Sequence, residues 1–250
     1  MIEQKYNLEG LRPAEHACEA DPRNTMFVRI DRTNGSSRPI ELGDHHELIS
    51  RYVLHAGVPQ EIVLQFETAR NVYLYAWFVD RFYPVAEHQC LACLELALRE
   101  RLKEEIRMGK IKGKRPALRL LLKYAADNGL VRNEGVSAWQ NRGEINSRAR
   151  VEMEGLREAS EKNLTEWTID ESDIQITAED LDWDYVKMLP NLLPMLRNDY
   201  AHGGTDLHNW SLRSFQIVSE IINQLWQPPA RGIVTGTPDH RPGDSGGAGE

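Results

Sequence analysis

Residues 85–106 read VAEHQCLACLELALRERLKEEI, and their apolar side chains recur every three to four positions. That period is typical of an α-helix with one buried face. Pro84 fits the first turn of such a helix, and Gly109 stands where a helix commonly ends. The stretch predicts a long helix whose buried face consists of Val85, Leu91, Leu94, Leu98, Leu102 and Ile106.

Helical periodicity continues on both sides of this stretch. Residues 60–82 are rich in apolar and aromatic side chains at the same spacing. Because only the segment around Pro84 separates the two runs, we expect them to pack as an antiparallel pair. Further helices are predicted over 116–128, 144–162, 181–189 and 206–226. The fold class is therefore expected to be mainly α, an antiparallel helical bundle.

The first 57 residues form a separate N-terminal extension with a different pattern. Residues 25–31 alternate between apolar and polar side chains, which is typical of a short strand. The Asn34-Gly35 pair supplies a turn, and residues 38–42 can return as an edge strand. We predict a small β-hairpin, followed by a short helix capped by Asp44.

The remainder divides into a helical domain and a tail. The helical domain spans 58–226 and carries a charged insertion around 130–180. Within the insertion, the helix predicted at 144–162 has a thin apolar stripe of Ile145, Ala149, Met153 and Leu156. Residues 227–250 hold six glycines and four prolines without an apolar pattern, which predicts a flexible, disordered tail.

Composition excludes several classes of protein. With 41% hydrophobic and 27% charged residues in 250, the chain is typical of a globular protein. No apolar run approaches the roughly 20 residues of a membrane span, and the N-terminus lacks the apolar segment of a secretion signal. Three cysteines do not make a disulfide framework. We expect a cytoplasmic protein with no membrane association.

The charge is unevenly distributed. The formal net charge is −8, yet residues 99–123 carry ten basic side chains against three acidic ones. This asymmetry is consistent with a local anion-binding face, or with a solvated helix surface and a basic loop. The candidate RNA-binding residues in this window are Lys110, Lys112, Lys114 and Arg115.

One short motif stands out near the last helix. Arg197-Asn198-Asp-Tyr-Ala-His202 is followed by two glycines. An arginine and a histidine at similar spacing also occur at Arg38/His45 and at Arg81/His88, so spacing alone is not decisive. Only the motif at 197–202 combines a polar residue after the arginine, an Ala-His-Gly ending and an amphipathic helix downstream.

This motif resembles the Arg-x(4–6)-His motif of the HEPN superfamily (higher eukaryotes and prokaryotes nucleotide-binding). The segment Cys93-Leu-Glu95-Leu-Ala-Leu-Arg99 is similar to an earlier helix common in that family. The resemblance implies an α-helical, metal-independent endoribonuclease of toxin or phage-defence type that leaves a 2′,3′-cyclic phosphate. It also implies a homodimer whose two motifs face a shared cleft, and a neutralising antitoxin or nucleotidyltransferase-like partner.

The residue types suit that chemistry. A histidine with a pKa near ~6.5 can transfer protons at neutral pH, and an arginine can bind two phosphate oxygens. We therefore assign His202 as base or acid and Arg197 as the group that stabilises phosphate charge. On an ideal helix these side chains point about 140° apart, so we expect a helix end or bulge between them, or contributions from two chains. Asn198 and Glu95 are candidate orienting groups, although Glu95 also fits a surface position.

Two other functions remain open. The chain can be a non-catalytic helical dimerisation or adaptor module, or a nucleotide-binding sensor that uses the same arginine and histidine to hold phosphate. Cys90-Leu-Ala-Cys93 lies inside a helical apolar pattern without further metal-ligand spacing, so we interpret both cysteines as buried. No cofactor and no metal are expected.

Overall fold

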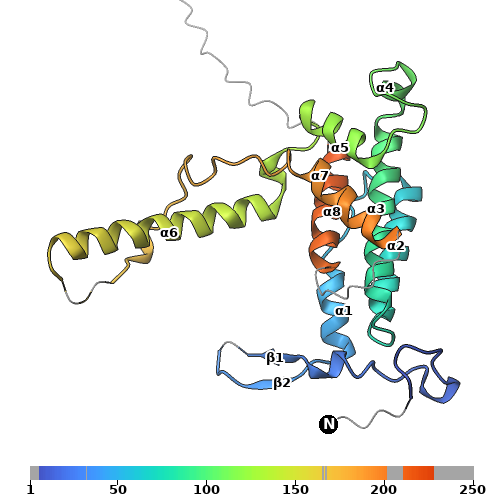
Figure 1. The fold of residues 1–250 in the computed structure, drawn as a ribbon, viewed down its shortest axis with the longest axis horizontal. Coiled ribbons are helices and arrows are strands. Elements are labelled where there is room, and N and C mark those ends of the chain that lie inside the picture. Colours follow the sequence, from blue (N-terminus) through green and yellow to red (C-terminus); the bar gives the residue numbers. More distant parts are fainter. Residues whose placement is uncertain (1–5, 32, 165, 167, 202–210, 228–250) are drawn as a thin grey trace, which may run out of the picture.

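The computed structural model describes residues 6–31, 33–164, 166, 168–201 and 211–227. This part of the chain is mainly helical, with one two-stranded sheet (Figure 1). Its α-helices are α1 Leu42–Ser50, α2 Gln60–Tyr75, α3 Phe82–Arg101, α4 Lys103–Arg107, α5 Leu118–Asp127, α6 Ser137–Glu161, α7 Leu189–Ala201 and α8 Ser211–Trp226. Its strands are β1 Val28–Ile30 and β2 Ser37–Pro39, and its short 3₁₀ helices are Ala14–His16, Asn24–Met26, Asn133–Gly135 and Glu171–Asp173.

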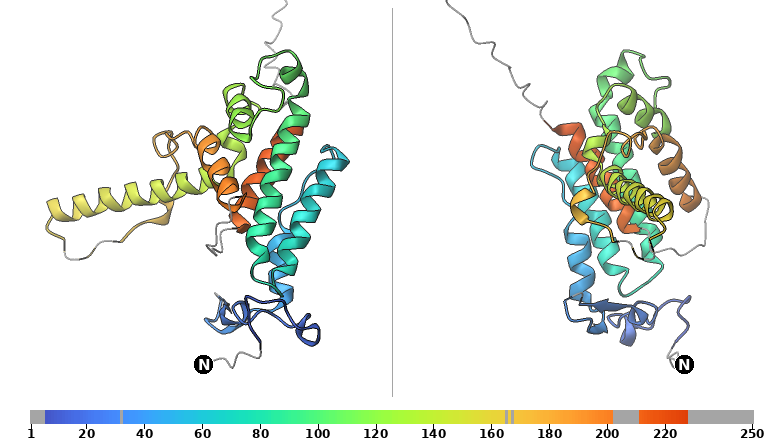
Figure 2. Two further views of the ribbon diagram at one scale, coloured as in Figure 1. Left: turned by 45° about the vertical axis from the view of Figure 1, so that its right-hand side comes forward. Right: turned by 90° about the vertical axis from the view of Figure 1, so that its left-hand side faces the viewer.

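Helix α3 is the centre of the bundle. It packs against α2 and α8 along its length, and against α7 and α5 (Figures 1 and 2). The predicted buried face is confirmed in its middle, where Leu91, Leu94 and Leu98 are fully buried. Val85 is exposed, because six residues of helix turn it about 120° away from Leu91. The apolar period of α3 therefore organises the core.

Several helices end at residues other than those predicted. Helix α2 ends at Tyr75, not at residue 82, and a turn leads into α3. Pro84 lies in the first turn of α3, as expected. The long helix breaks at Leu102, where φ is −106° and ψ is 16°, so α4 is a separate short helix. Gly109, with φ of 72°, follows α4 in the left-handed conformation that glycine adopts without strain.

The predicted N-terminal hairpin forms, but with shorter strands, and the second strand ends at Pro39 instead of residue 42. Strands β1 and β2 are antiparallel, with Val28 opposite Pro39, and Gly35 in the turn has φ of 71°. The prediction that Asp44 caps the following helix is wrong. Helix α1 begins earlier, and the Asp44 carboxylate accepts a 2.9 Å hydrogen bond from the backbone N–H of Glu41, one residue before the helix.

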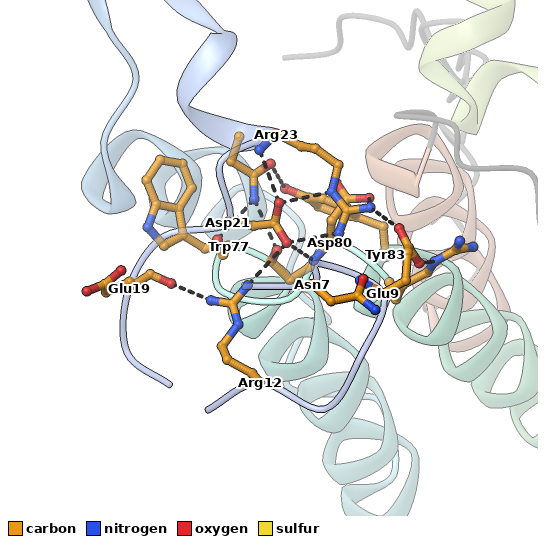
Figure 3. A network of polar contacts seen from close by, with 12 residues as sticks. Asn7, Glu9, Arg12, Glu19, Asp21, Arg23, Trp77, Asp80 and Tyr83 are labelled. Carbon is orange, nitrogen blue, oxygen red and sulfur yellow. Dashed lines mark hydrogen bonds and ion pairs between the residues drawn. The ribbon is translucent and has the colours of Figure 1, made fainter. Parts of the chain in front are cut away.

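A buried carboxylate ties the N-terminal segment to the bundle (Figure 3). Asp21 is completely buried and accepts hydrogen bonds from Arg12 at 3.2 Å and from Arg23 Nε at 2.9 Å. It also accepts the backbone N–H of Asp80, in the turn between α2 and α3, at 3.3 Å. Burial alone would raise the pKa of Asp21, but Arg23 and the backbone N–H groups of Arg23 and Asp80 hold it below its usual range. This network is a structural anchor, since its charges are mutually compensated.

Helix α6 projects from the bundle as an arm (Figures 1 and 2). It begins at Ser137, seven residues before the predicted start, and residues 175–180 lie along it. Its buried face consists of the small residues Gly143, Ser147, Gly155 and Ala159. The predicted apolar stripe is instead exposed, because the returning segment packs against the small side chains.

The segment before α7 also differs from the prediction. No α-helix covers 181–188, and α7 begins only at Leu189. Pro190 occupies its first turn, whereas Pro194 lies inside the helix. The described residues contain no helix with the length and apolar character that crossing a membrane requires.

Candidate functional site

The structure brings together two of the predicted site residues, Glu95 of α3 and Arg197 of α7. Arg197 Nη1 lies 2.8 Å from Glu95 Oε2. Glu95 belongs to the face of α3 that α7 covers, so its carboxylate is only 6% exposed. A buried carboxylate without a partner is costly, and the ion pair compensates that cost. Of the two open interpretations of Glu95, the surface position is therefore excluded.

A second arginine shares the same carboxylate. Arg99 lies one helical turn after Glu95 and forms an ion pair with its Oε1 atom. Arg99 also donates a 3.4 Å hydrogen bond to the carbonyl of Pro116, at the end of the basic loop. Sequence reasoning did not assign Arg99 to the site, although the i,i+4 spacing of a glutamate and an arginine was a usable signal.

The three side chains form a cluster with excess positive charge. One carboxylate cannot neutralise two guanidinium groups, so the cluster carries a formal charge of +1. The Arg99 and Arg197 side chains are 39% and 33% exposed, above a carboxylate that is buried. Their Nε–H groups are buried and have no hydrogen-bond partner among the described residues. Only the exposed part of each guanidinium can still donate to an anion.

The four predicted RNA-binding residues lie on an exposed loop between α4 and α5. Lys110, Lys112, Lys114 and Arg115 are all exposed. Ile111 is buried within the loop and fixes it to the bundle. Gly113, with φ of 94°, allows the turn between the lysines. The loop follows α4, and Glu95 lies six residues before the end of α3, about 9 Å along that helix.

The other half of the motif falls largely outside the described residues. Asn198 belongs to α7, but its side chain is not described, and His202 lies beyond the last described residue of that helix. Helix α7 is continuous from Arg197 to Ala201. The predicted helix bulge between the arginine and the histidine is thus absent up to residue 201.

The two competing Arg/His pairs are structural. Arg38 binds the Asp44 carboxylate from β2. His45 is 3% exposed, with its Nε2 atom 2.9 Å from the carbonyl oxygen of Tyr73, and burial lowers its pKa. Arg81 binds Glu9 at 2.7 Å at the opposite end of α3 from the basic loop. Neither pair shares the arrangement at Glu95.

A second buried carboxylate on α3 was not predicted. Glu87 is completely buried and accepts a 2.5 Å hydrogen bond from Ser214 of α8. It lies two helical turns before Glu95 on the same side of α3. The sequence signal was its position within the apolar stripe, which predicts burial for any residue there.

The two cysteines of α3 belong to the hydrophobic core of the bundle. Cys90 and Cys93 are buried and unpaired, and burial raises the pKa of Cys93 to about 12. Among the described residues, no three histidine, cysteine or carboxylate side chains lie in an arrangement that would hold a metal ion.

No family model matches this chain, and no curated protein or solved structure matches it significantly.

Proposed function

We propose that the protein is a metal-independent endoribonuclease with a HEPN-type helical bundle, of toxin or phage-defence character. The observation that carries the proposal is the cluster of Arg197 and Arg99 above the buried Glu95. It presents two guanidinium groups at the surface, held by one carboxylate. The planar fork of a guanidinium matches the geometry of two phosphate oxygens, so a phosphodiester is a suitable anion for this cluster.

The chemistry follows from residue types. His202 removes the proton from the 2′-hydroxyl, and the 2′-oxygen attacks the adjacent phosphorus. Arg197 stabilises the charge that develops on the non-bridging oxygens. The bond from phosphorus to the 5′-oxygen breaks, and the proton held by His202 passes to that oxygen, directly or through a water molecule, which regenerates the neutral imidazole. The products are a 2′,3′-cyclic phosphate and a 5′-hydroxyl.

Glu95 has a positioning role in this proposal. It touches Arg197 and Arg99 but lies beneath them, so it orients the guanidinium groups without meeting the substrate. Asn198, next to Arg197 in α7, stays a candidate orienting residue. Lys110, Lys112, Lys114 and Arg115 contribute contacts to the RNA backbone, which add affinity without sequence choice.

The test is cleavage of a labelled single-stranded RNA by the purified full chain in EDTA. The expected products carry the cyclic phosphate, identified by mass spectrometry. Arg197→Ala should slow cleavage by about 10²–10³-fold, and His202→Ala by about 10²–10⁴-fold. Absence of cleavage by the wild-type chain would overturn the proposal.

The chain offers a matched control for the histidine variant. His88 also follows an arginine at motif-like spacing, but it lies on α3 and is half-buried. His88→Ala should cleave at the wild-type rate. Equal losses in the His88 and His202 variants would show that the activity does not depend on the motif.

Melting temperatures measured with and without nucleotides, together with the cleavage assay, separate the two rival functions. A nucleotide sensor would show a rise in melting temperature with nucleotides but no turnover. An adaptor module would show neither response. The neutralising partner implied by the HEPN resemblance stays a prediction, and it becomes relevant once cleavage is observed.

A further inference from the structure

A cavity of about 720 Å³ lies between the N-terminal segment and the bundle. Its walls come from the N-terminal segment, α1, α2, the turn before α3, α3 and α8, and they are largely apolar and aromatic. The apolar and aromatic side chains are Met26, Phe27, Ile40, Leu48, Tyr73, Tyr83 and Leu212. A cavity of this size and lining, with a few polar side chains, is typical of a small-molecule site.

One polar side chain in the cavity wall is His45, which is almost completely buried. Its Nε2 atom lies 2.9 Å from the carbonyl oxygen of Tyr73, so Nε2 is the donor and carries the ring proton. Burial lowers the pKa of His45, which keeps the ring neutral at neutral pH. The Nδ1 atom therefore has a lone pair, and it makes no hydrogen bond with another described residue. His45 thus contributes a hydrogen-bond acceptor to the wall.

Another polar side chain in the wall is Asp80, in the turn between α2 and α3 (Figure 3). Its carboxylate accepts no hydrogen bond from another described residue, and Arg23 Nη1 lies 3.7 Å away. Arg23 instead donates to Asp21 at 2.9 Å and to Glu9 at 2.8 Å. Although Arg23 attracts the carboxylate, burial raises the pKa of Asp80 above its usual range. The charge of Asp80 is thus incompletely compensated, and a cationic donor in the cavity would complete the compensation.

The aromatic part of the wall is held in place by its own contacts. Tyr83 donates a 3.1 Å hydrogen bond from its hydroxyl group to Asn24. The Tyr83 ring meets the Tyr73 ring edge-on with 5.2 Å between centroids, and the Tyr73 ring stacks on His45 at 4.6 Å. Rings fixed in this way can pack against an aromatic ligand with little loss of conformational freedom, and their π faces attract a cation.

We propose that this cavity binds a small aromatic amine in its protonated form. The ammonium group pairs with the Asp80 carboxylate, and the ring of the ligand packs among Tyr73, Tyr83 and Phe27. His45 Nδ1 adds a second acceptor, which favours N–H donors on the ligand and opposes a carboxylate or a phosphate. The ligand is therefore opposite in charge to RNA.

The cavity lies apart from the proposed nuclease site. Tyr83 belongs to the first turn of α3, and Glu95 follows twelve residues later, about 18 Å along the helix. The described wall of the cavity contains none of Glu95, Arg99 and Arg197. Binding of an aromatic amine therefore does not depend on the nuclease function, and either proposal can fail without the other.

The test is isothermal titration calorimetry of the full chain with tryptamine and two matched probes. Tryptamine should bind with a Kd on the order of 0.1–1 mM, as expected for a ligand of this size. Tryptophol, which has a hydroxyl group in place of the ammonium group, should bind at least about tenfold more weakly. Indole-3-propionate, which carries a negative charge, should not bind. Absence of tryptamine binding, or equal affinity for tryptamine and tryptophol, would overturn the proposal.

Asp80→Asn tests the charge of the cavity. The variant should lose about tenfold in affinity for tryptamine and should bind tryptamine and tryptophol alike. An aspartate that only supported the fold would leave the preference between the two probes unchanged. A preference for tryptamine that persists in Asp80→Asn would therefore contradict the assigned role of this carboxylate.

A second variant tests the location without touching the polar network. Leu48 of α1 lines the cavity and is 38% exposed, so Leu48→Trp should fill the cavity and abolish tryptamine binding while the circular dichroism spectrum stays unchanged. Leu64→Trp is the matched control, because Leu64 on α2 is 58% exposed and does not line the cavity. It should bind tryptamine as the wild type does. Wild-type affinity in Leu48→Trp would place the binding site elsewhere and overturn the proposal.

Discussion

Arg197 of α7 lies 2.8 Å from the carboxylate of Glu95 on α3, and Arg99 binds the same carboxylate from the next turn of its own helix. One buried negative charge thereby holds two partly exposed guanidinium groups in place. The arrangement leaves an excess positive charge at the surface, and Arg99 also donates a hydrogen bond to Pro116, which follows a loop with four further cations. The buried carboxylate thereby connects the core of the bundle to the surface that is proposed to bind RNA.

Glu95→Gln should destabilise the fold. The neutral amide cannot compensate the positive charge of two guanidinium groups. Its NH₂ group is also a hydrogen-bond donor, and it would face the hydrogen-bond donors of the arginines. Because both arginines are partly exposed, we expect a loss of about 1–3 kcal/mol in the free energy of unfolding. Urea denaturation monitored by circular dichroism measures it.

Glu100→Gln is the matched control for this change. Glu100 lies on the same helix and pairs with Lys103, but both side chains are about half exposed. The Glu100→Gln variant should lose at most about 0.5 kcal/mol in the free energy of unfolding. Equal effects of the two variants would contradict the structural role of Glu95.

Removing lysines from the basic loop should reduce the salt dependence of RNA binding. Each phosphate contact to single-stranded RNA adds about 0.7 to the slope of log K against log salt. Replacing Lys110, Lys112 and Lys114 with alanine should lower the slope by about 2, measured by fluorescence anisotropy. Lys162→Ala, at the far end of α6, should leave it unchanged. An unchanged slope in the triple variant would exclude the loop from the RNA interface.

Mild acid should weaken the fold through His45. The pKa of His45 in the folded chain lies below its usual value of 6.5, because burial disfavours the charged ring. As pH falls below about 6.5, the unfolded chain takes up a proton that the folded chain does not, so the free energy of unfolding decreases. His45→Gln should reduce this slope, by at most about 1.4 kcal/mol per pH unit.

The pH window distinguishes His45 from the carboxylates. Asp21 and Asp44 have lowered pKa values, so their contributions are present at neutral pH and are lost only below about pH 5. Unfolding titrations between pH 5 and pH 7 therefore report on His45. A slope that is identical in wild type and His45→Gln would refute the assignment.

The three cysteines should differ sharply in reactivity. Cys18 is exposed, whereas Cys90 and Cys93 are buried and have raised pKa values. Since the thiolate is the reacting species, a thiol reagent should modify one cysteine in the folded chain and three after denaturation. Rapid modification of all three under native conditions would contradict the packing of α3.

Local patterns predicted much of the fold. The apolar period of α3, the Asn34-Gly35 turn and the positive φ at Gly109 all follow from interactions among neighbouring residues. In α6 the sequence showed only a thin apolar stripe on a highly charged helix, and in the structure that stripe is exposed while the small residues are buried. A helical period defines a face, but the segment that covers a face comes from elsewhere in the chain.

In the candidate site, too, spacing along the chain predicts one part and the packing of distant helices decides the other. The sequence determined that Arg197 stands in a HEPN-like motif and that Glu95 borders an apolar stripe, because both depend on spacing along the chain. Only the packing of α7 on α3 decided that the two side chains meet, and that Arg99 joins them. Spacing fixes the direction of a side chain on its helix, whereas burial and charge partners arise when distant helices come together.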